Sequence, residues 1–415
     1  MVLAFLPHPR AALLLGCAAG RALCRLRATG RRLAFSLQPP ASHRMSDLYF
    51  AYGSNLNDAD FHAWCQLRGF ESDCMRALGT AMLPDTELVF DHYSRARYGG
   101  VLNLRPRLGQ VTAGVVFEVM PEGWDVLDIR EGAMRTPSRS GRPTHRRSRR
   151  HAILADGSVR EVFTYEAEQS STDSFVVPSQ DYVEIVRRGL EAYDLDTATL
   201  DQAALGQAPD FAVTGLFLCG AEMRGESRFA DLARHGVSCV LLAHAEGVLL
   251  DLVDATALCL GPEPIRVRGE FLVPVDLPAL LAAKDTHEGA LPMGAPGGWC
   301  RRTVLPVNVG DGHVQPAWAY VVERASLRAA ARISSGCWRT YRGGAENFYR
   351  ALVTAHESRN PQLVAMLQDA LHELLRPATA PTLTATPHGI AAALAEGSVS
   401  ERSLARISGA WAVVP

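Results

Sequence analysis

One pattern occurs twice along this chain of 415 residues, and it constrains the fold more than any other feature. In each copy a short apolar run leads into a glycine turn, at Gly53 and at Gly220. An acidic residue followed by glycine lies roughly 70 to 80 residues further on, Glu131 in the first copy and Glu288 in the second. Such self-similarity indicates an internal duplication, so we expect two similar domains.

Length and composition agree with this division. The chain is long enough for roughly two to four domains, and its apolar fraction of 47% is enough to bury hydrophobic cores. We place the domains at residues 46–195 and 210–325, separated by a linker rich in Ala, Asp, Gln and Thr. Apolar residues at helical spacing over 344–375 predict a helical C-terminal extension, residues 326–415.

The first glycine turn, residues 52–56, follows an apolar run and precedes a polar stretch, which is typical of a strand, a turn and a helix start. Such a turn points several backbone N–H groups at one spot, near the positive end of the helix dipole. It predicts a place to bind a carboxylate or a phosphate. Taken alone, a capped helix start without a ligand is the commoner interpretation.

Glu131 is a candidate acid/base group, because it follows a second apolar stretch and precedes Gly132. The alternative is a helix C-terminus that Gly132 closes in the left-handed conformation, with Glu131 in solvent.

The turn and the acidic segment together resemble the gamma-glutamylcyclotransferase family. That family opens with a Tyr-Gly-Ser-Asn-Leu loop and carries its catalytic glutamate in a Leu-Asp-x-x-Glu-Gly segment; residues 52–56 and 127–132 match both. Residues 94–100 resemble its Ser-x-x-x-x-Gly-Gly segment, and residues 178–182 resemble its Pro-Ser-x-x-Tyr signature. The four matches are in the family's order and span residues 47–195.

The resemblance implies a cofactor-independent enzyme that cyclises a gamma-glutamyl group to 5-oxoproline and releases an amine or amino acid. It implies that Glu131 is the catalytic acid/base group. The residues that it implies for substrate binding are Tyr52, Gly53, Ser54, Asn55, Leu56, Ser94 and Tyr182. The alternative is a catalytically silent module that binds gamma-glutamyl metabolites and reports through the paired domain. The leaving amine stays open, because all gamma-glutamyl compounds share the half that the turn would bind.

The second copy departs from the family pattern at its turn. Cys219, Ala221 and Glu222 stand where bacterial relatives of the family have Tyr, Thr and Leu. Glu222 would repel an anionic substrate group unless it points away. Gly220 and Glu288 remain as a possible second site, and the domain is either active or structural.

The expected fold is α/β. The resemblance implies two copies of a mixed sheet that closes toward a small barrel with a few peripheral helices. Short strands with only occasional helices between them argue against a doubly wound sheet.

The first 44 residues contain several arginines but no Asp, Glu or Lys. Their apolar run is shorter than the roughly 20 residues that span a membrane. They are either a targeting segment or precede the true start at Met45, which we prefer because Ser46 onwards begins as members of the family begin.

The net charge and the cysteine content limit the partners and the cellular compartment that we expect. The net charge of −2 supports no nucleic-acid partner, and we expect no membrane association. The nine cysteines are scattered without a close-spaced metal pair, so we expect a reducing, cytoplasmic compartment. Neither a metal nor a cofactor is expected, because the cyclisation that the resemblance implies requires none. A small-molecule gamma-glutamyl substrate is the expected partner, and the oligomeric state stays open.

Seven arginines and no acid lie between residues 135 and 150. This run predicts a solvated loop, and the alternative is a lid that recognises an anionic part of the substrate or a partner.

Overall fold

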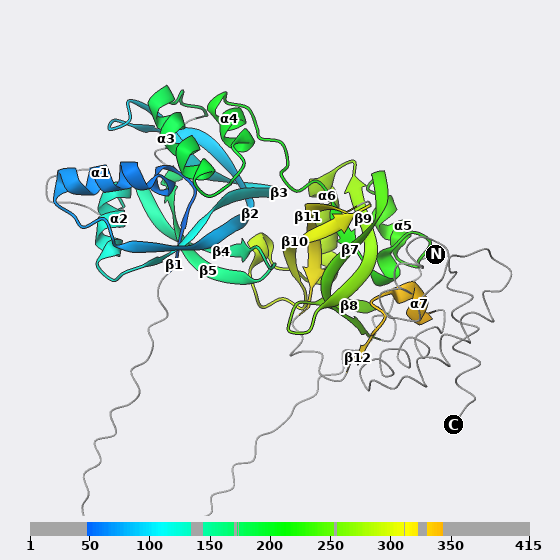
Figure 1. Ribbon diagram of the computed structural model, residues 1–415. Helices are drawn as coiled ribbons and strands as arrows, with labels where there is room; N and C mark the ends of the chain where they lie inside the picture. Colours follow the sequence, from blue (N-terminus) through cyan, green and yellow to red (C-terminus); the bar gives the residue numbers. More distant parts are fainter. Residues whose placement is uncertain are drawn as a thin grey trace, which may run out of the picture. The chain divides into compact units, whose positions relative to one another are not determined.

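The computed structural model describes residues 48–133, 144–169, 172, 174–252, 255–310, 312–322 and 330–342 (Figure 1). The N-terminal segment 1–44 and the helix predicted over 344–375 lie outside these residues. The described part of the predicted helical extension contains only a short strand, β12 (Ala331–Arg332), and a short helix, α7 (Trp338–Arg342).

The first lobe, residues 48–204, is built on a closed five-stranded barrel with the strand order β1-β3-β2-β4-β5. Strand β1 pairs antiparallel with β3 and parallel with β5, and this second pairing closes the barrel. The bounds are β1 Leu48–Ala51, β2 Met75–Ser94, β3 Gly99–Val119, β4 His145–Leu154 and β5 Val159–Ala167. The predicted mixed sheet that closes into a small barrel is thus confirmed for this lobe.

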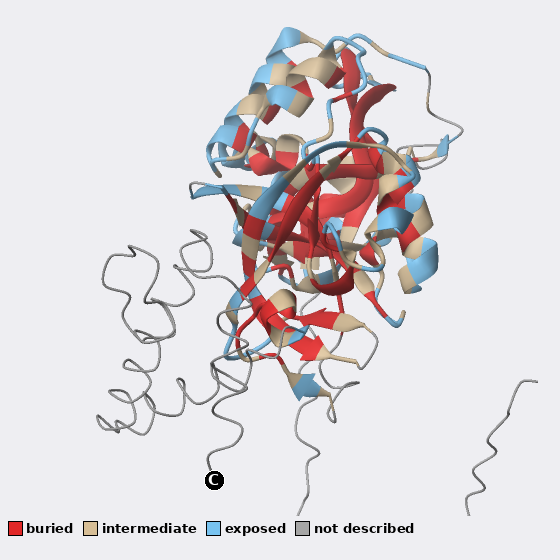
Figure 2. Cartoon of the chain, turned by 90° about the vertical axis from the view of Figure 1, so that its right-hand side faces the viewer, coloured by how far each residue is buried: buried red, intermediate tan, exposed pale blue. Residues whose placement is uncertain are grey.

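Gly114 of β3 allows the barrel to close. A Cβ atom at this position would lie 2.3 Å from the carbonyl oxygen of Ala51 and 2.5 Å from Cζ of Phe50. Any larger residue would therefore push β1 away from β3. Phe50 is fully buried, and buried residues follow the strands while the helices carry most of the exposed ones (Figure 2).

Local capping signals set the ends of the two helices nearest the site. Helix α1 (Asp58–Arg68) begins after Asn57, whose side chain accepts a hydrogen bond from the backbone N–H of Asp60 at 3.1 Å. Helix α2 (Gly123–Glu131) ends at Gly132, which has a φ of 69°. The lobe also contains η1 Ser54–Leu56, α3 Gln180–Glu191 and α4 Ala198–Ala204.

The prediction of a solvated loop is wrong for the second half of the arginine-rich run, because β4 begins at His145 and pairs along its length with β5. Its arginines have acidic partners: Arg147 pairs with Asp128, and Arg149 with Glu161. Local arginine content suggests a loop, whereas partners distant in sequence stabilise a strand.

The second lobe, residues 216–342, holds a mixed sheet with the order β10-β11-β6-β9-β7-β12, and β8 pairs with β7. The bounds are β6 Leu216–Leu218, β7 Val237–Asp251, β8 Thr256–Cys259, β9 Ile265–Pro274, β10 Arg301–Val309 and β11 His313–Val321. Its helices are η3 Gly220–Glu222, α5 Phe229–Ala233, α6 Leu277–Glu288 and η4 Pro292–Gly294.

The two sheets share one strand order. Strand β10 also pairs with β7, so that pairings run β6-β9-β7-β10-β11 and return to β6, as they run β1-β3-β2-β4-β5 and return to β1. The first strand of each lobe is parallel to the strand that closes this ring, β1 to β5 and β6 to β11. Among the residues that the structure describes, every helix is too short or too polar to traverse a lipid bilayer.

Candidate functional site

The first glycine turn lies between β1 and α1, as the sequence predicts. Its residues Ser54–Leu56 form the 3-10 helix η1, in which the backbone N–H of Leu56 donates to the carbonyl of Gly53 at 3.0 Å. The N–H groups of Ser54 and Asn55 begin this helix, where they have no acceptor within it. They are therefore the turn's candidates for binding an anion.

Asn55 connects the turn to Glu131. Its Nδ2 donates to Glu131 Oε1 and to the hydroxyl of Tyr49, both at 2.8 Å. Its Oδ1 accepts from Arg130 Nε at 2.5 Å. The side chain is only 3% exposed, so these three bonds hold one orientation.

Glu131 is half-buried at the end of α2. Gly132 closes the helix, as the alternative interpretation proposes, but the carboxylate is bound by Asn55 and does not extend freely into solvent. Burial raises the pKa of Glu131, although Arg130, Asn55 and Arg97 oppose this effect. A carboxyl group whose pKa is shifted toward neutrality can take up and return a proton more readily at neutral pH.

An ion-pair cluster that the sequence analysis missed lies beside this carboxylate. Asp60 of α1 accepts from Arg97 at 2.6 and 3.0 Å and from Arg130 at 2.6 Å. Arg130 also lies over the rings of Phe61 and Trp64, 5.2 Å from each centroid. The position of Arg130 next to Glu131 was the available signal, whereas nothing local indicates Arg97.

A cavity of about 990 Å³ opens in front of Glu131. Of the predicted site residues, Ser54, Ser94, Glu131 and Tyr182 line it. Asn55 and Leu56 are buried behind it, and Gly53 lies so close that an added Cβ would be 3.6 Å from the Tyr182 hydroxyl.

The two predicted tyrosines differ in position. Tyr52 is buried and donates its hydroxyl to the backbone carbonyl of Tyr165 at 2.7 Å. Tyr182 faces the cavity, and its hydroxyl accepts from the backbone N–H of Leu102 at 3.4 Å. Burial and the Glu131 carboxylate raise the pKa of Tyr182 to about 12, which keeps it a neutral hydroxyl.

Asp128 fixes the end of α2 against the barrel. It accepts from the Tyr165 hydroxyl at 2.5 Å, and Arg147 Nη2 donates to its other oxygen at 2.9 Å. Arg147 and Tyr165 are direct partners in the register of β4 and β5. Two neighbouring strands thus bind one carboxylate that precedes Glu131 by three residues.

The second lobe repeats this arrangement. Asp285 accepts from the Tyr320 hydroxyl at 2.6 Å, and Arg302 Nε lies 3.0 Å from the same carboxylate oxygen. Arg302 and Tyr320 are partners in the register of β10 and β11, and Asp285 precedes Glu288 by three residues. The same three residue types at matching positions support an internal duplication.

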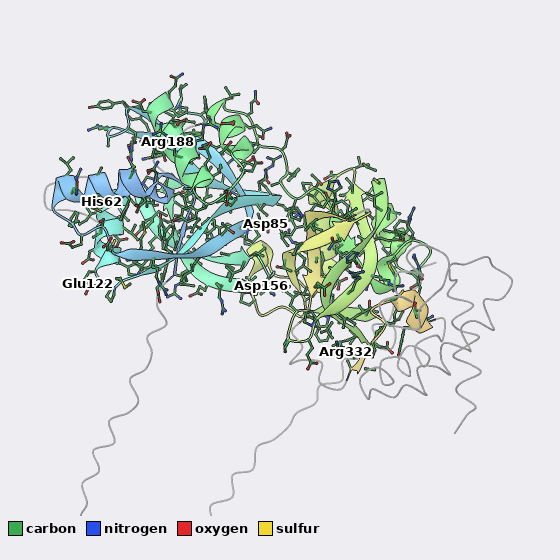
Figure 3. All side chains as sticks on the ribbon, in the orientation of Figure 1. His62, Asp85, Glu122, Asp156, Arg188 and Arg332 are labelled. Carbon is green, nitrogen blue, oxygen red and sulfur yellow. The ribbon has the colours of Figure 1, made fainter. Side chains whose placement is uncertain are left out.

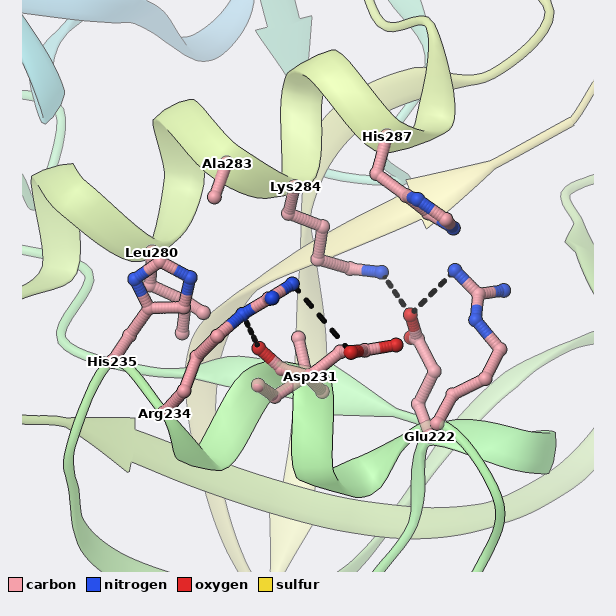
Figure 4. Close-up of a pocket in the computed structure, with 10 residues that line it drawn as sticks. Glu222, Asp231, Arg234, His235, Leu280, Ala283, Lys284 and His287 are labelled. Carbon is pink, nitrogen blue, oxygen red and sulfur yellow. Dashed lines mark hydrogen bonds and ion pairs between the residues drawn. The ribbon is translucent and has the colours of Figure 1, made fainter. Parts of the chain in front are cut away.

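The second turn has a glycine like the first turn, but a different polar side chain follows it. Gly220 has a φ of 73°, and a Cβ there would lie 1.7 Å from Thr256 Oγ1. Glu222 follows it by two residues, which is the place of Asn55 in the first lobe. Lys284 Nζ lies 2.5 Å from Glu222 Oε1, so the charge of Glu222 is neutralised (Figure 4).

The same lysine binds Glu288. Lys284 Nζ lies 3.2 Å and Arg228 Nη2 3.0 Å from Glu288 Oε1. Burial alone would raise the pKa of Glu288, but Lys284 and Arg228 outweigh it and hold the pKa below its usual value. Leu127 takes the place of Lys284 in the first lobe. The net pKa shifts of the two glutamates are therefore opposite, because burial prevails at Glu131 and the cations prevail at Glu288.

A smaller cavity, of about 250 Å³, lies against the second cluster and is lined by Cys219, Glu222, Lys284 and Glu288. Burial, with Glu222 nearby, raises the pKa of Cys219 to about 12. This thiol is therefore protonated and unreactive at neutral pH. In the described ranges, no group of three or more His, Cys, Asp or Glu side chains is arranged to hold a metal ion.

Comparisons with known proteins relate both lobes to one family. A family profile described as “Gamma-glutamyl cyclotransferase, AIG2-like” matches residues 49–184 and 216–340, together more than half of the chain. No curated protein matches the sequence.

Solved structures match this chain with low sequence identity and low TM-scores. A structure titled “Gamma-glutamyl cyclotransferase” is 23% identical, covers 38% of this chain and 85% of its own, and has a TM-score of 0.32. The uncharacterized protein loc79017 from Homo sapiens is 22% identical over the same shares, with a TM-score of 0.31. YkqA from Bacillus subtilis is 14% identical, covers 67% of this chain and 84% of its own, and has a TM-score of 0.27.

Proposed function

Because the chain belongs to the gamma-glutamyl cyclotransferase, AIG2-like family, we propose that its first lobe converts a gamma-glutamyl amine or amino acid to 5-oxoproline and a free amine. The observation that carries this proposal is the Glu131 carboxylate, which Asn55 binds at 2.8 Å on the wall of a cavity of about 990 Å³. The Glu131 carboxylate is one proton-exchanging group, and the cavity beside it has room for a substrate.

The reaction needs one proton carrier. Glu131 takes a proton from the substrate α-ammonium, and the freed amine attacks the γ-carbonyl carbon to form a five-membered ring. The bond from that carbon to the leaving nitrogen then breaks, and Glu131 returns the proton to this nitrogen. The ring nitrogen gives up its second proton to Glu131, which passes it to the released amine, so that the amine leaves as an ammonium ion. Charge and protons balance without a cofactor. Holding the substrate folded for intramolecular attack is worth on the order of 7 to 11 kcal/mol.

The other site residues position the reactants. The N–H groups of Ser54 and Asn55 bind the substrate α-carboxylate. Asn55 also orients Glu131, and Ser94 and Tyr182 form walls of the pocket. Tyr52 acts indirectly, because its hydroxyl is bound to the barrel backbone and braces the turn.

The second lobe is catalytically silent in this proposal. Its glutamate is paired with both Lys284 and Arg228, which stabilise the ionised form and weaken it as a base. The shared strand order and the repeated Asp–Tyr–Arg arrangement support the division into domains 46–195 and 210–325. The binding-module alternative therefore applies best to the second domain.

The test is 5-oxoproline release from a panel of gamma-glutamyl amino acids and amines. Glu131→Gln should lower kcat by roughly 10²- to 10⁴-fold while the fold is kept, and Glu288→Gln is the matched control that should retain turnover. Unchanged turnover in Glu131→Gln would contradict the role of Glu131. A comparable loss in Glu288→Gln would show that both lobes contribute. Binding without turnover of any member would favour the silent module for the whole chain.

A further inference from the structure

The cavity of the first lobe continues well past the reacting group. It runs beside α1 from Asp60 to Arg68, which are eight residues apart and so about 12 Å apart along the helix axis at 1.5 Å per residue. The turn between β2 and β3 lines it as well, and Arg97 of this turn binds Asp60 of α1. The turn and α1 therefore both line the cavity and are joined by this ion pair.

Positive charge exceeds negative charge along this wall. Four arginines line the cavity, against the two carboxylates of Asp60 and Glu131; they are Arg68, Arg95, Arg97 and Arg130. Arg97 and Arg130 both pair with Asp60. Arg68 and Arg95 form no ion pair with any acid in the described part of the chain, although both side chains border the cavity.

Arg68 lies against an aromatic ring and has no acidic partner among the described residues. Its Cζ lies 5.1 Å from the centre of the Trp64 ring, and Trp64 is in turn stacked on Phe70 with centroids 5.8 Å apart. A guanidinium bound to an aromatic face keeps its donors free for another partner.

We propose that Arg68 and Arg95 form an outer anion subsite, which binds a carboxylate or phosphate carried by the leaving part of the substrate. This inference rests on the proposed function. Because Arg68 lies about two helical turns beyond Asp60, the acidic group lies roughly 10 Å from the amide that breaks. An extended chain spans about 3.3–3.6 Å per residue, so the fitting substrate class is a gamma-glutamyl peptide with an acidic group about three residues from that amide.

The experiment compares gamma-Glu-Gly-Gly-Asp with gamma-Glu-Gly-Gly-Asn, both as C-terminal amides, and with a phosphoserine version. In the unmodified protein kcat/KM should be about three- to tenfold higher for an acidic peptide than for the Asn peptide. The double variant Arg68→Gln/Arg95→Gln should reduce this preference to less than about twofold. Added salt should reduce it too, because exposed charges are screened over about 8 Å at 0.15 M ionic strength.

Arg188→Gln is the matched control. Arg188 lies on α3 (Figure 3). Its side chain is 69% exposed and does not line the cavity. It should keep the full preference for the acidic peptide. The better of the Asp and phosphoserine peptides identifies the acidic group.

Failure of the proposed subsite can be distinguished from failure of the proposed function. Turnover of all peptides with equal kcat/KM would overturn the subsite and leave the cyclotransferase function standing. If no peptide and no small gamma-glutamyl amine is turned over, the proposed function fails, and calorimetric Kd values for the Asp and Asn peptides decide on the subsite. Equal Kd values would overturn it, and tighter binding of the acidic peptide that Arg68→Gln/Arg95→Gln abolishes would support it.

Discussion

Lys284 precedes Glu288 by one helical turn and places its ammonium 3.2 Å from that carboxylate, whereas the apolar Leu127 takes the same place before Glu131. This difference contributes to the opposite pKa shifts of two glutamates at matching positions. One is a protonatable group beside a large cavity, and the other is half of an ion pair.

Removing the lysine should destabilise the second lobe. Lys284 is 5% exposed, and Lys284→Leu would leave the carboxylates of Glu222 and Glu288 with Arg228 as their one cationic partner among the residues that the structure describes. We expect a loss of about 3 kcal/mol in the free energy of unfolding, measured with urea. The double variant Glu222→Asn/Lys284→Leu, which copies the first lobe, should lose clearly less. A loss below about 1 kcal/mol in the single variant would show that the pair contributes little.

The two glutamates should affect stability with opposite pH dependence. The folded-state pKa of Glu131 is raised, so its stabilising effect is present below its unfolded pKa of 4.5 and is lost as pH rises through the folded value. Glu131→Gln should therefore gain stability relative to the unmodified protein toward neutral pH. The folded-state pKa of Glu288 is lowered, so its contribution is present above 4.5 and is lost as pH falls through the folded value.

Glu288→Gln should accordingly lose stability at neutral pH and approach the unmodified protein in acid. Urea unfolding of both variants between pH 4 and 8 checks the two signs. Parallel curves for the two variants would contradict the electrostatic difference between the lobes.

Asn55 should set the pH at which the enzyme works. Its hydrogen bond lowers the pKa of Glu131, so Asn55→Ala should raise that pKa. Because Glu131 must be ionised to accept a proton, the acidic limb of the kcat/KM profile should move to higher pH, and kcat should fall by about 10-fold or more. A profile that keeps its position would show that Asn55 acts on substrate binding alone.

The matching tyrosines allow positioning to be separated from stability. Tyr165→Phe and Tyr320→Phe each remove one hydrogen bond to a buried or partly buried aspartate, which should cost about 1.5–3 kcal/mol of unfolding free energy. Only Tyr165→Phe should lower kcat, because Asp128 holds the helix that carries Glu131. Equal turnover in both variants would show that the hydrogen bond of Tyr165 to Asp128 does not position Glu131.

The sequence indicates the turns and helix ends well, because these depend on neighbouring residues. Gly132 and Gly289 both close a helix in the left-handed conformation directly after a glutamate. The strand–turn–helix order around Gly53 is likewise a local property, and the structure places it as predicted.

Contacts between distant segments explain what the sequence analysis missed. The arginine-rich sequence of β4 predicts a loop, because the acidic partners of these arginines, Asp128 and Glu166, lie about 20 residues away along the chain. Arg97 reaches the site only because the end of a long hairpin meets α1. Lys284 has one partner, Glu288, four residues away on the same helix, but its other partner, Glu222, becomes apparent only when α6 meets the turn after β6.

The shared strand order has a consequence for how the chain folds. Tandem domains that resemble each other can exchange equivalent segments and become trapped as swapped species. If α6 docked in the place of α2, it would bury the Lys284 ammonium in a barrel that offers Asn55 instead of Glu222, so that Lys284 would lose one of its two carboxylate partners and keep Glu288 of its own helix. The substitution that separates the chemistry of the two lobes thus also disfavours misassembly between them.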